Sequence, residues 1–163
     1  HKNKGAIFTQ LLTEYGNTHS AELRGDICAA LCSTHDKKQI HKLIKLFKNT
    51  SIIRSQDLLR WFIYLLRNRH AVEETWNWLE ESWDWIEKSY SGSKSYDDFA
   101  RYSASIFNTQ EWLKRYQTFF KPKINDPALK RTIKIGLKEI KARVEWRKRD
   151  EPKIKQWFEQ QIT

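Results

Sequence analysis

Apolar residues recur every three or four positions along almost the whole chain. The clearest stripe occupies positions 129, 133, 137, 140 and 144, a spacing that keeps all five residues on one face of an α-helix. Five glycines and three prolines among 163 residues are few for a chain rich in β-turns. The pattern predicts an all-α protein of about nine helices, in which short loops make sequence neighbours antiparallel.

Capping residues and loops separate these helices. The expected helices cover residues 5–16, 18–33, 37–49, 56–68, 71–90, 96–107, 110–120, 128–150 and 150–161. We expect a helix C-cap at Gly16 and N-caps at Thr18, Asp36, Ser55, Ser95, Asn108 or Thr109, and Asp126. Helix pairs recur about every 36–40 residues, which resembles a HEAT-like α-solenoid. We treat 1–163 as a single helical domain.

Residues 74–90 contain four of the eight tryptophans. In a helix, Trp76 and Trp83 share one face with Leu79, Ile86 and Tyr90, whereas Trp78 and Trp85 lie on a second face. Six carboxylates and a single lysine accompany them between positions 73 and 88. A stacking platform for single-stranded nucleic acid would have basic residues there. We therefore interpret these tryptophans as the packing of a helix that is buried on two sides.

Cysteine usage and apolar content limit the possible classes further. Cys28 and Cys32 are four residues apart, and with His35 they could bind a metal, but the spacing and the lack of a second ligand pair favour two buried thiols. No apolar run is long enough to span a membrane, and no signal peptide is evident. We expect a cytoplasmic protein without a membrane partner. The chain begins without Met, so we interpret it as a fragment or a processed product.

The net charge of +10 leaves an alternative open. Residues 121–155 carry thirteen Lys or Arg against five Asp or Glu. A free-standing basic helical array could bind nucleic acid, and a stand-alone solenoid could bind peptides or act as a scaffold. Lysines that fill the solvent side of an amphipathic helix are the simpler explanation. We favour this explanation over a nucleic-acid partner.

Four segments resemble one known family in the same order along the chain. They are Trp-x-Trp-Leu-x-x-x-Trp at 76–83, "IRSQDLLRWF" at 53–62, "FNTQEWLKRYQTFF" at 107–120 and "IKARVEWRKRDEPKIKQWF" at 140–158. Together they resemble the C-terminal helical, HEAT-like domain of the zinc aminopeptidase N family, most like its Gram-positive bacterial members. The resemblance covers residues 52–158, and "LCSTHD" at 31–36 is similar more loosely.

The resemblance implies a role without catalysis for this fragment. The family's zinc-binding His-Glu-x-x-His sequence and its Gly-x-Met-Glu-Asn motif are absent, so we expect no catalytic and no metal-binding residues here. Zinc and the hydrolysis of peptides would belong to an upstream catalytic domain of the same chain. The helical domain would cap the active-site cavity and restrict the access of peptides. Arg54 and, more weakly, Gln56 are the residues that would face this cavity.

Overall fold

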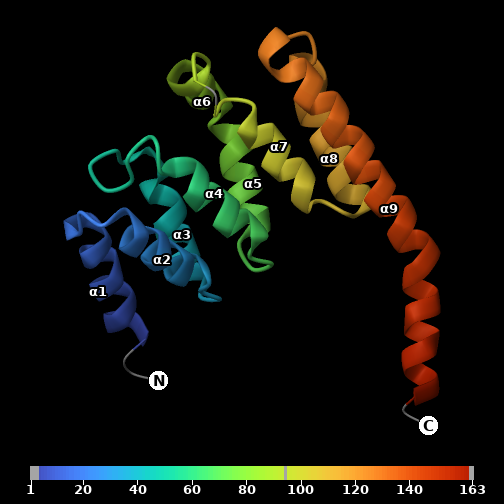
Figure 1. The fold of residues 1–163 in the computed structure, drawn as a ribbon, viewed down its shortest axis with the longest axis horizontal. Helices are drawn as coiled ribbons and strands as arrows, with labels where there is room; N and C mark the ends of the chain where they lie inside the picture. Colours follow the sequence, from blue (N-terminus) through green and yellow to red (C-terminus); the bar gives the residue numbers. More distant parts are fainter. Residues whose placement is uncertain (1–3, 94, 162–163) are drawn as a thin grey trace. The chain divides into compact units, whose positions relative to one another are not determined.

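The computed structural model describes residues 4–93 and 95–161, and every regular element in these residues is helical (Figure 1). It has nine α-helices and two short 3-10 helices there. The prediction of an all-α fold is confirmed. The chain divides into two compact units, His1–Trp85 and Ile86–Thr163, each with its own core. No helix in the described ranges is long and apolar enough to cross a membrane.

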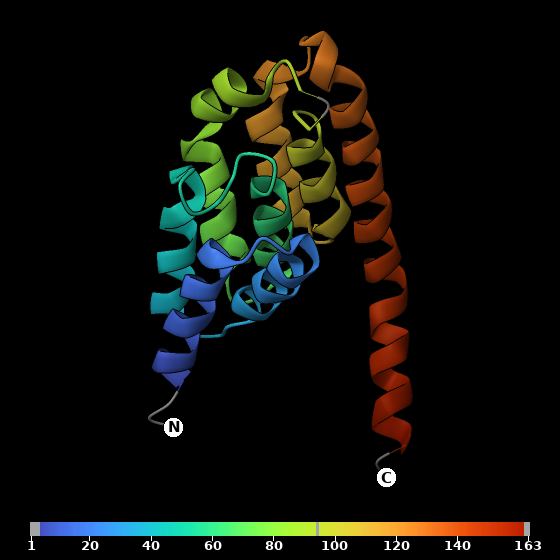
Figure 2. The ribbon, with the colours of Figure 1, turned by 60° about the vertical axis from the view of Figure 1, so that its left-hand side comes forward.

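The first unit is built from two layers of helices. Its elements are α1 (Lys4–Asn17), α2 (Ala21–Cys32), α3 (Lys37–Lys45), η1 (Leu46–Lys48), α4 (Leu58–Arg67), α5 (Val72–Glu81) and the start of α6 (Trp83–Tyr90). Helices two places apart pack side by side, α2 on α4 and α3 on α5, and α4 also packs on α5 (Figure 2). Helical repeats stack in this way, because each helix pair buries its apolar face against the next.

Aromatic side chains fill the core of the first unit. Trp61 is fully buried, and its Nε1 donates a hydrogen bond of 2.9 Å to Tyr15 Oη. The two rings meet edge to face at 5.0 Å, which is a favourable arrangement for aromatic pairs. Phe47 and Trp78 make a second edge-to-face pair at 4.7 Å. Tyr15 thereby satisfies the buried N–H of Trp61 from the other layer of helices.

The tryptophan-rich segment is buried as predicted, but it forms two helices. Trp76, Trp78 and Trp83 are buried, and Trp85 is half-buried. The helix breaks at Ser82, where the backbone leaves the helical region and α5 ends. The expected single helix over 71–90 is therefore wrong, whereas the interpretation of its tryptophans as core is confirmed.

The second unit is organised around one long helix. It contains the rest of α6, α7 (Asp98–Ile106), α8 (Gln110–Phe120), η2 (Lys121–Lys123) and α9 (Pro127–Gln161). Both α7 and α8 pack against α9. The face of α9 that carries Leu129, Ile133 and Ile140 is buried in this contact. Gly136 lies on the same face, where α7 and α8 approach so closely that a Cβ would meet Ala104.

Two arginines of α9 bind the end of α7. Arg143 donates hydrogen bonds to the backbone oxygens of Ala104 and Phe107, and Arg147 donates one of 2.9 Å to Asn108 Oδ1. The last carbonyls of a helix have no partner within it and carry partial negative charge. The guanidinium of Arg143 therefore both caps α7 and fixes it to α9.

The last turns of α9 extend beyond α7 and α8 (Figures 1 and 2). All residues of 151–161 are exposed, and Trp157 and Phe158 are each 55% exposed. A separate terminal helix that begins at Asp150 was expected, but α9 continues through Pro152 without interruption. The predicted number of nine helices is nevertheless correct in the described residues, because one expected helix is split and two others are joined.

Three of the expected helix caps are confirmed, and four are wrong. Asp36 caps α3 by accepting from the backbone N–H groups of Lys38 and Gln39, and Thr109 caps α8. Asp126 Oδ1 accepts from Ala128 N at 2.8 Å at the start of α9. The expected N-caps at Thr18, Ser55 and Ser95 are wrong, since Ser20, Asp57 and Asp97 occupy those positions. The expected C-cap at Gly16 is also wrong, because α1 runs on to Asn17.

Candidate functional site

Arg54 and Gln56 lie in the turn that leads into α4. Both side chains are exposed, and the backbone oxygen of Arg54 accepts from Asp57 N at 2.8 Å and from Leu58 N at 3.2 Å. The turn thus presents a cation and an amide to solvent while its backbone is held by the start of the helix. Both side chains are available for a contact outside the first unit, and their role remains a proposal.

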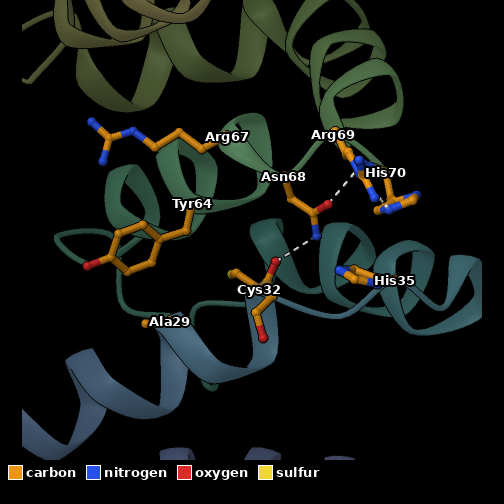
Figure 3. Close-up of a pocket in the computed structure, with 9 residues that line it drawn as sticks. Ala29, Cys32, His35, Tyr64, Arg67, Asn68, Arg69 and His70 are labelled. Carbon is orange, nitrogen blue, oxygen red and sulfur yellow. Dashed lines mark hydrogen bonds between the residues drawn. The ribbon is translucent and has the colours of Figure 1, made fainter. Parts of the chain in front are cut away.

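A pocket of about 370 Å³ lies at the opposite end of α4, between two loops (Figure 3). Asn68 joins these loops. Its Nδ2 donates to the backbone oxygens of Cys32 at 2.9 Å and of Thr34 at 2.7 Å, and its Oδ1 accepts from His70 N at 2.9 Å. One amide therefore holds the end of α2 and the segment after α4 in a fixed arrangement.

Two histidines meet beside this amide. The rings of His35 and His70 are 4.5 Å apart between centroids, with 38° between their planes. Arg69 Nε donates to His70 Nε2 at 3.1 Å, so this nitrogen is the acceptor and the ring is neutral there. Desolvation lowers the pKa of His70 first, and the positive charges of His35, Arg69 and Lys37 lower it further. We call His35, Lys37, Arg69 and His70 the cationic cluster.

A second depression of about 510 Å³ lies between α3 and α5 in the same unit. His41 Nδ1 contacts Glu74 Oε1 at 2.5 Å across it, and Lys48 lies over the ring of Trp85 at 5.7 Å. Its basic side chains come from α3 and η1, and its acidic ones from α5. These charges face one another, so the depression resembles an ordinary contact between two helices.

The described residues do not fit a catalytic zinc centre. They contain no group of three or more His, Cys, Asp or Glu side chains that could hold a metal ion. Cys28 and Cys32 are buried thiols, and burial raises the pKa of Cys32, so it is a poor source of thiolate. We therefore derive no chemical step through a metal in this chain.

No pattern in the sequence predicts the cationic cluster. His35 and His70 are 35 positions apart, and the segment "LCSTHD", which contains His35, does not indicate a contact with His70. Their approach depends on Asn68, whose amide looks in the sequence like an ordinary polar residue at a helix end. In the sequence, the one candidate ligand set that contains His35 is the set with the two cysteines, and Cys32 does line the same pocket.

Comparison with known proteins gives a consistent result. Residues 2–142 match the model of a family described as ERAP1-like C-terminal domain. The chain is 36% identical over 138 residues to aminopeptidase N of Lactobacillus helveticus and 35% identical over 130 residues to aminopeptidase N of Lactococcus lactis subsp. lactis (strain IL1403). It is 26% identical over 153 residues to glutamyl aminopeptidase of Mus musculus.

The matches cover most of this chain but only a small part of each relative. The matches take in 85%, 80% and 94% of this chain but only 16%, 15% and 16% of the relatives. The chain therefore spans about one sixth of the length of the relatives it matches. The resemblance seen in the four sequence segments is confirmed, and the chain belongs to the ERAP1-like C-terminal domain family.

Proposed function

We propose that this chain is the C-terminal helical domain of a zinc-dependent aminopeptidase that removes N-terminal residues from peptides. The observation that carries the proposal is the match over residues 2–142, together with relatives named aminopeptidase of which the chain spans 16% and 15%. The lack of a His-Glu-x-x-His sequence among the 163 residues supports an accessory role. Zinc, the catalytic residues and most of the peptide-binding surface then belong to an upstream domain of the same cytoplasmic polypeptide.

The helical domain would act by covering the active-site cavity. A cover of this kind limits the length of peptides that enter and excludes water from the reacting groups. In this role Arg54 faces the cavity, where its guanidinium binds a carboxylate of the peptide or of the catalytic domain. Gln56, two residues further on in the same exposed turn, adds an uncharged hydrogen-bonding group.

The mass of the native gene product tests the proposal. An antibody against this chain, applied to a lysate of the source organism, isolates the product for intact-mass analysis and metal determination. We expect a protein several times larger than 19.7 kDa that contains zinc and hydrolyses aminoacyl substrates. A native product of about 19.7 kDa without aminopeptidase activity contradicts the proposal.

Replacement of Arg54 tests the cavity-facing role in the full-length enzyme. We expect Arg54→Ala to reduce kcat/KM for peptides of four or more residues about tenfold, because a charge-assisted hydrogen bond contributes roughly 1.5–3 kcal/mol. Dipeptides and aminoacyl anilides, which are too short to reach the helical domain, keep their kcat/KM. Kinetics with a series of peptides of increasing length measure the difference.

The matched control is Arg131→Ala, which removes another exposed arginine from α9. This variant should have the same kcat/KM as the unmodified enzyme for both the long peptides and the short substrates. If Arg54→Ala lowers turnover of every substrate equally, or of none, Arg54 does not contact peptides in the cavity. Gln56→Ala follows the same pattern with a smaller loss, since a neutral hydrogen bond is weaker than a charged one.

A further inference from the structure

His35, Arg69 and His70 of the cationic cluster line the pocket of Figure 3, and Lys37 lies within electrostatic range of His70. Neither Arg69 nor Lys37 forms an ion pair with a carboxylate of the described residues. The charged groups that act on His70 are His35, Arg69 and Lys37, all of them basic. Elsewhere in the first unit a histidine has an acid beside it, as His41 has Glu74. Among the described residues, no carboxylate therefore pairs with Arg69 or Lys37 to balance the positive charge at this pocket.

The preference of basic residues for the C-terminal ends of helices explains only part of the positive charge at this pocket. Arg67 is the basic residue in the last turn of α4, where a cation stabilises the negative end of the helix dipole. Its side chain lies on the other side of Asn68 from the two histidines (Figure 3). The cluster itself comes from two separate segments, 35–37 and 69–70, that the amide of Asn68 holds together. A single helix terminus does not bring these four groups to one place.

The cluster offers several hydrogen-bond donors in a small space. Arg69 uses Nε for His70, which leaves the four N–H groups of its two terminal nitrogens. His70 keeps Nδ1–H, His35 carries one N–H when neutral and two when protonated, and the Lys37 ammonium lies within electrostatic range of His70. Charge-assisted donors of this kind bind oxygen atoms that carry negative charge, and a guanidinium does so in a forked geometry.

We propose that the pocket between the α2–α3 and α4–α5 loops binds the phosphate group of a small ligand through His35, Arg69 and His70, with the Lys37 ammonium adding positive charge nearby. A phosphate has several oxygens for the converging donors and a double negative charge for the unpaired cations. The ring of Tyr64 and the methyl group of Ala29 line the other side of the pocket and can contact an organic part of the ligand. This inference depends on the first unit alone and not on the proposed aminopeptidase function.

Proton uptake should accompany binding. In the free protein the pKa of His70 lies below its ordinary value of 6.5 because of desolvation and its basic neighbours. A bound dianion favours the charged ring and raises the pKa of His70, and the protonated Nε2 then donates to the dianion instead of accepting from Arg69 Nε. Between the two pKa values the complex holds a proton that the free protein lacks. Affinity therefore increases as the pH falls through this window, and becomes independent of pH above it.

Titration with sulfate tests the proposal, since sulfate stays a dianion at every pH used. In the full chain, NMR of the histidine ring protons at constant ionic strength should show saturable shifts for His35 and His70, with tighter binding at pH 6 than at pH 8. Arg69→Ala should weaken binding at least about fivefold. Arg131→Ala, which removes an exposed arginine of the second unit, should not. His70→Asn should retain weaker binding and lose most of its pH dependence.

Two results would overturn the inference. One is a linear shift without saturation, which indicates general screening by salt. The other is an equal dissociation constant for the unmodified chain and Arg69→Ala. Inorganic phosphate and phenyl phosphate then distinguish the source of the ligand. Tighter binding of phenyl phosphate identifies a phosphate monoester whose organic part contacts Tyr64, whereas equal binding identifies the free ion.

Discussion

Trp76→Ala should lower the free energy of unfolding by about 3–5 kcal/mol. Trp76 has no exposed surface and fills the first unit beside Leu79, which is equally buried. Removing a buried indole loses its transfer free energy and leaves a cavity that the surrounding helices fill only in part. Small domains are stable by roughly 5–15 kcal/mol in total, so the variant should be close to unfolding. Urea denaturation followed by circular dichroism measures the change.

Trp157→Ala is the control for this prediction. It removes the same side chain from α9, where Trp157 is 55% exposed. Its effect should stay within about 0.5 kcal/mol, as is usual for surface positions. Equal losses in the two variants would mean that burial in the first unit does not decide the role of Trp76.

Gly136→Ala should destabilise the second unit by about 2 kcal/mol, although alanine favours helices by roughly 1 kcal/mol over glycine. An added Cβ would lie 2.7 Å from Ala104 Cβ and 2.7 Å from Tyr116 Oη. Neither neighbour can move easily. Ala104 belongs to α7, and Tyr116 is fully buried and donates a hydrogen bond to Ala100 O at 3.2 Å. Thermal unfolding of the full chain measures the loss.

Two further variants separate overpacking from helix propensity. Gly16→Ala lies in α1 with no atom within 4 Å of the new Cβ, so it should be neutral or stabilising. Adding Tyr116→Phe to Gly136→Ala removes one of the two short contacts, and the cost of Gly136→Ala should be smaller in that background. An unchanged cost there would assign the destabilisation to Ala104 alone.

The sequence predicts the kind of structure better than its boundaries. The buried faces of the tryptophan segment follow from a 100° step per residue and are correct for Trp76 and Trp83. The break at Ser82 could not be predicted, because serine is compatible with a helix and only tertiary packing bends the chain there. At Pro152 the sequence predicts a helix boundary where the structure has none. It was expected in the first turn of a new helix, yet α9 continues past it.

The two candidate sites also differ in how far the sequence predicts them. Arg54 and Gln56 are predicted from the resemblance to a family, and this prediction depends only on one short segment of sequence. The cationic cluster required knowledge of which loops meet. Asn68 reaches back 36 positions to Cys32 and 34 positions to Thr34, and no periodic pattern encodes such a contact. Side chains brought together by such a contact cannot be recognised as neighbours until the fold is known.

The uninterrupted α9 is uniform in geometry but not in thermodynamic stability. Up to Ile140 its backbone is fixed by contact with α7 and α8. In the exposed turns after Glu151, only local hydrogen bonds offset the conformational entropy that is lost when the helix forms. Isolated helices of that length are marginal in water. Opening should therefore begin at the C-terminal turns and stop at Arg143 and Arg147, whose bonds to the end of α7 mark where the helix becomes part of the unit.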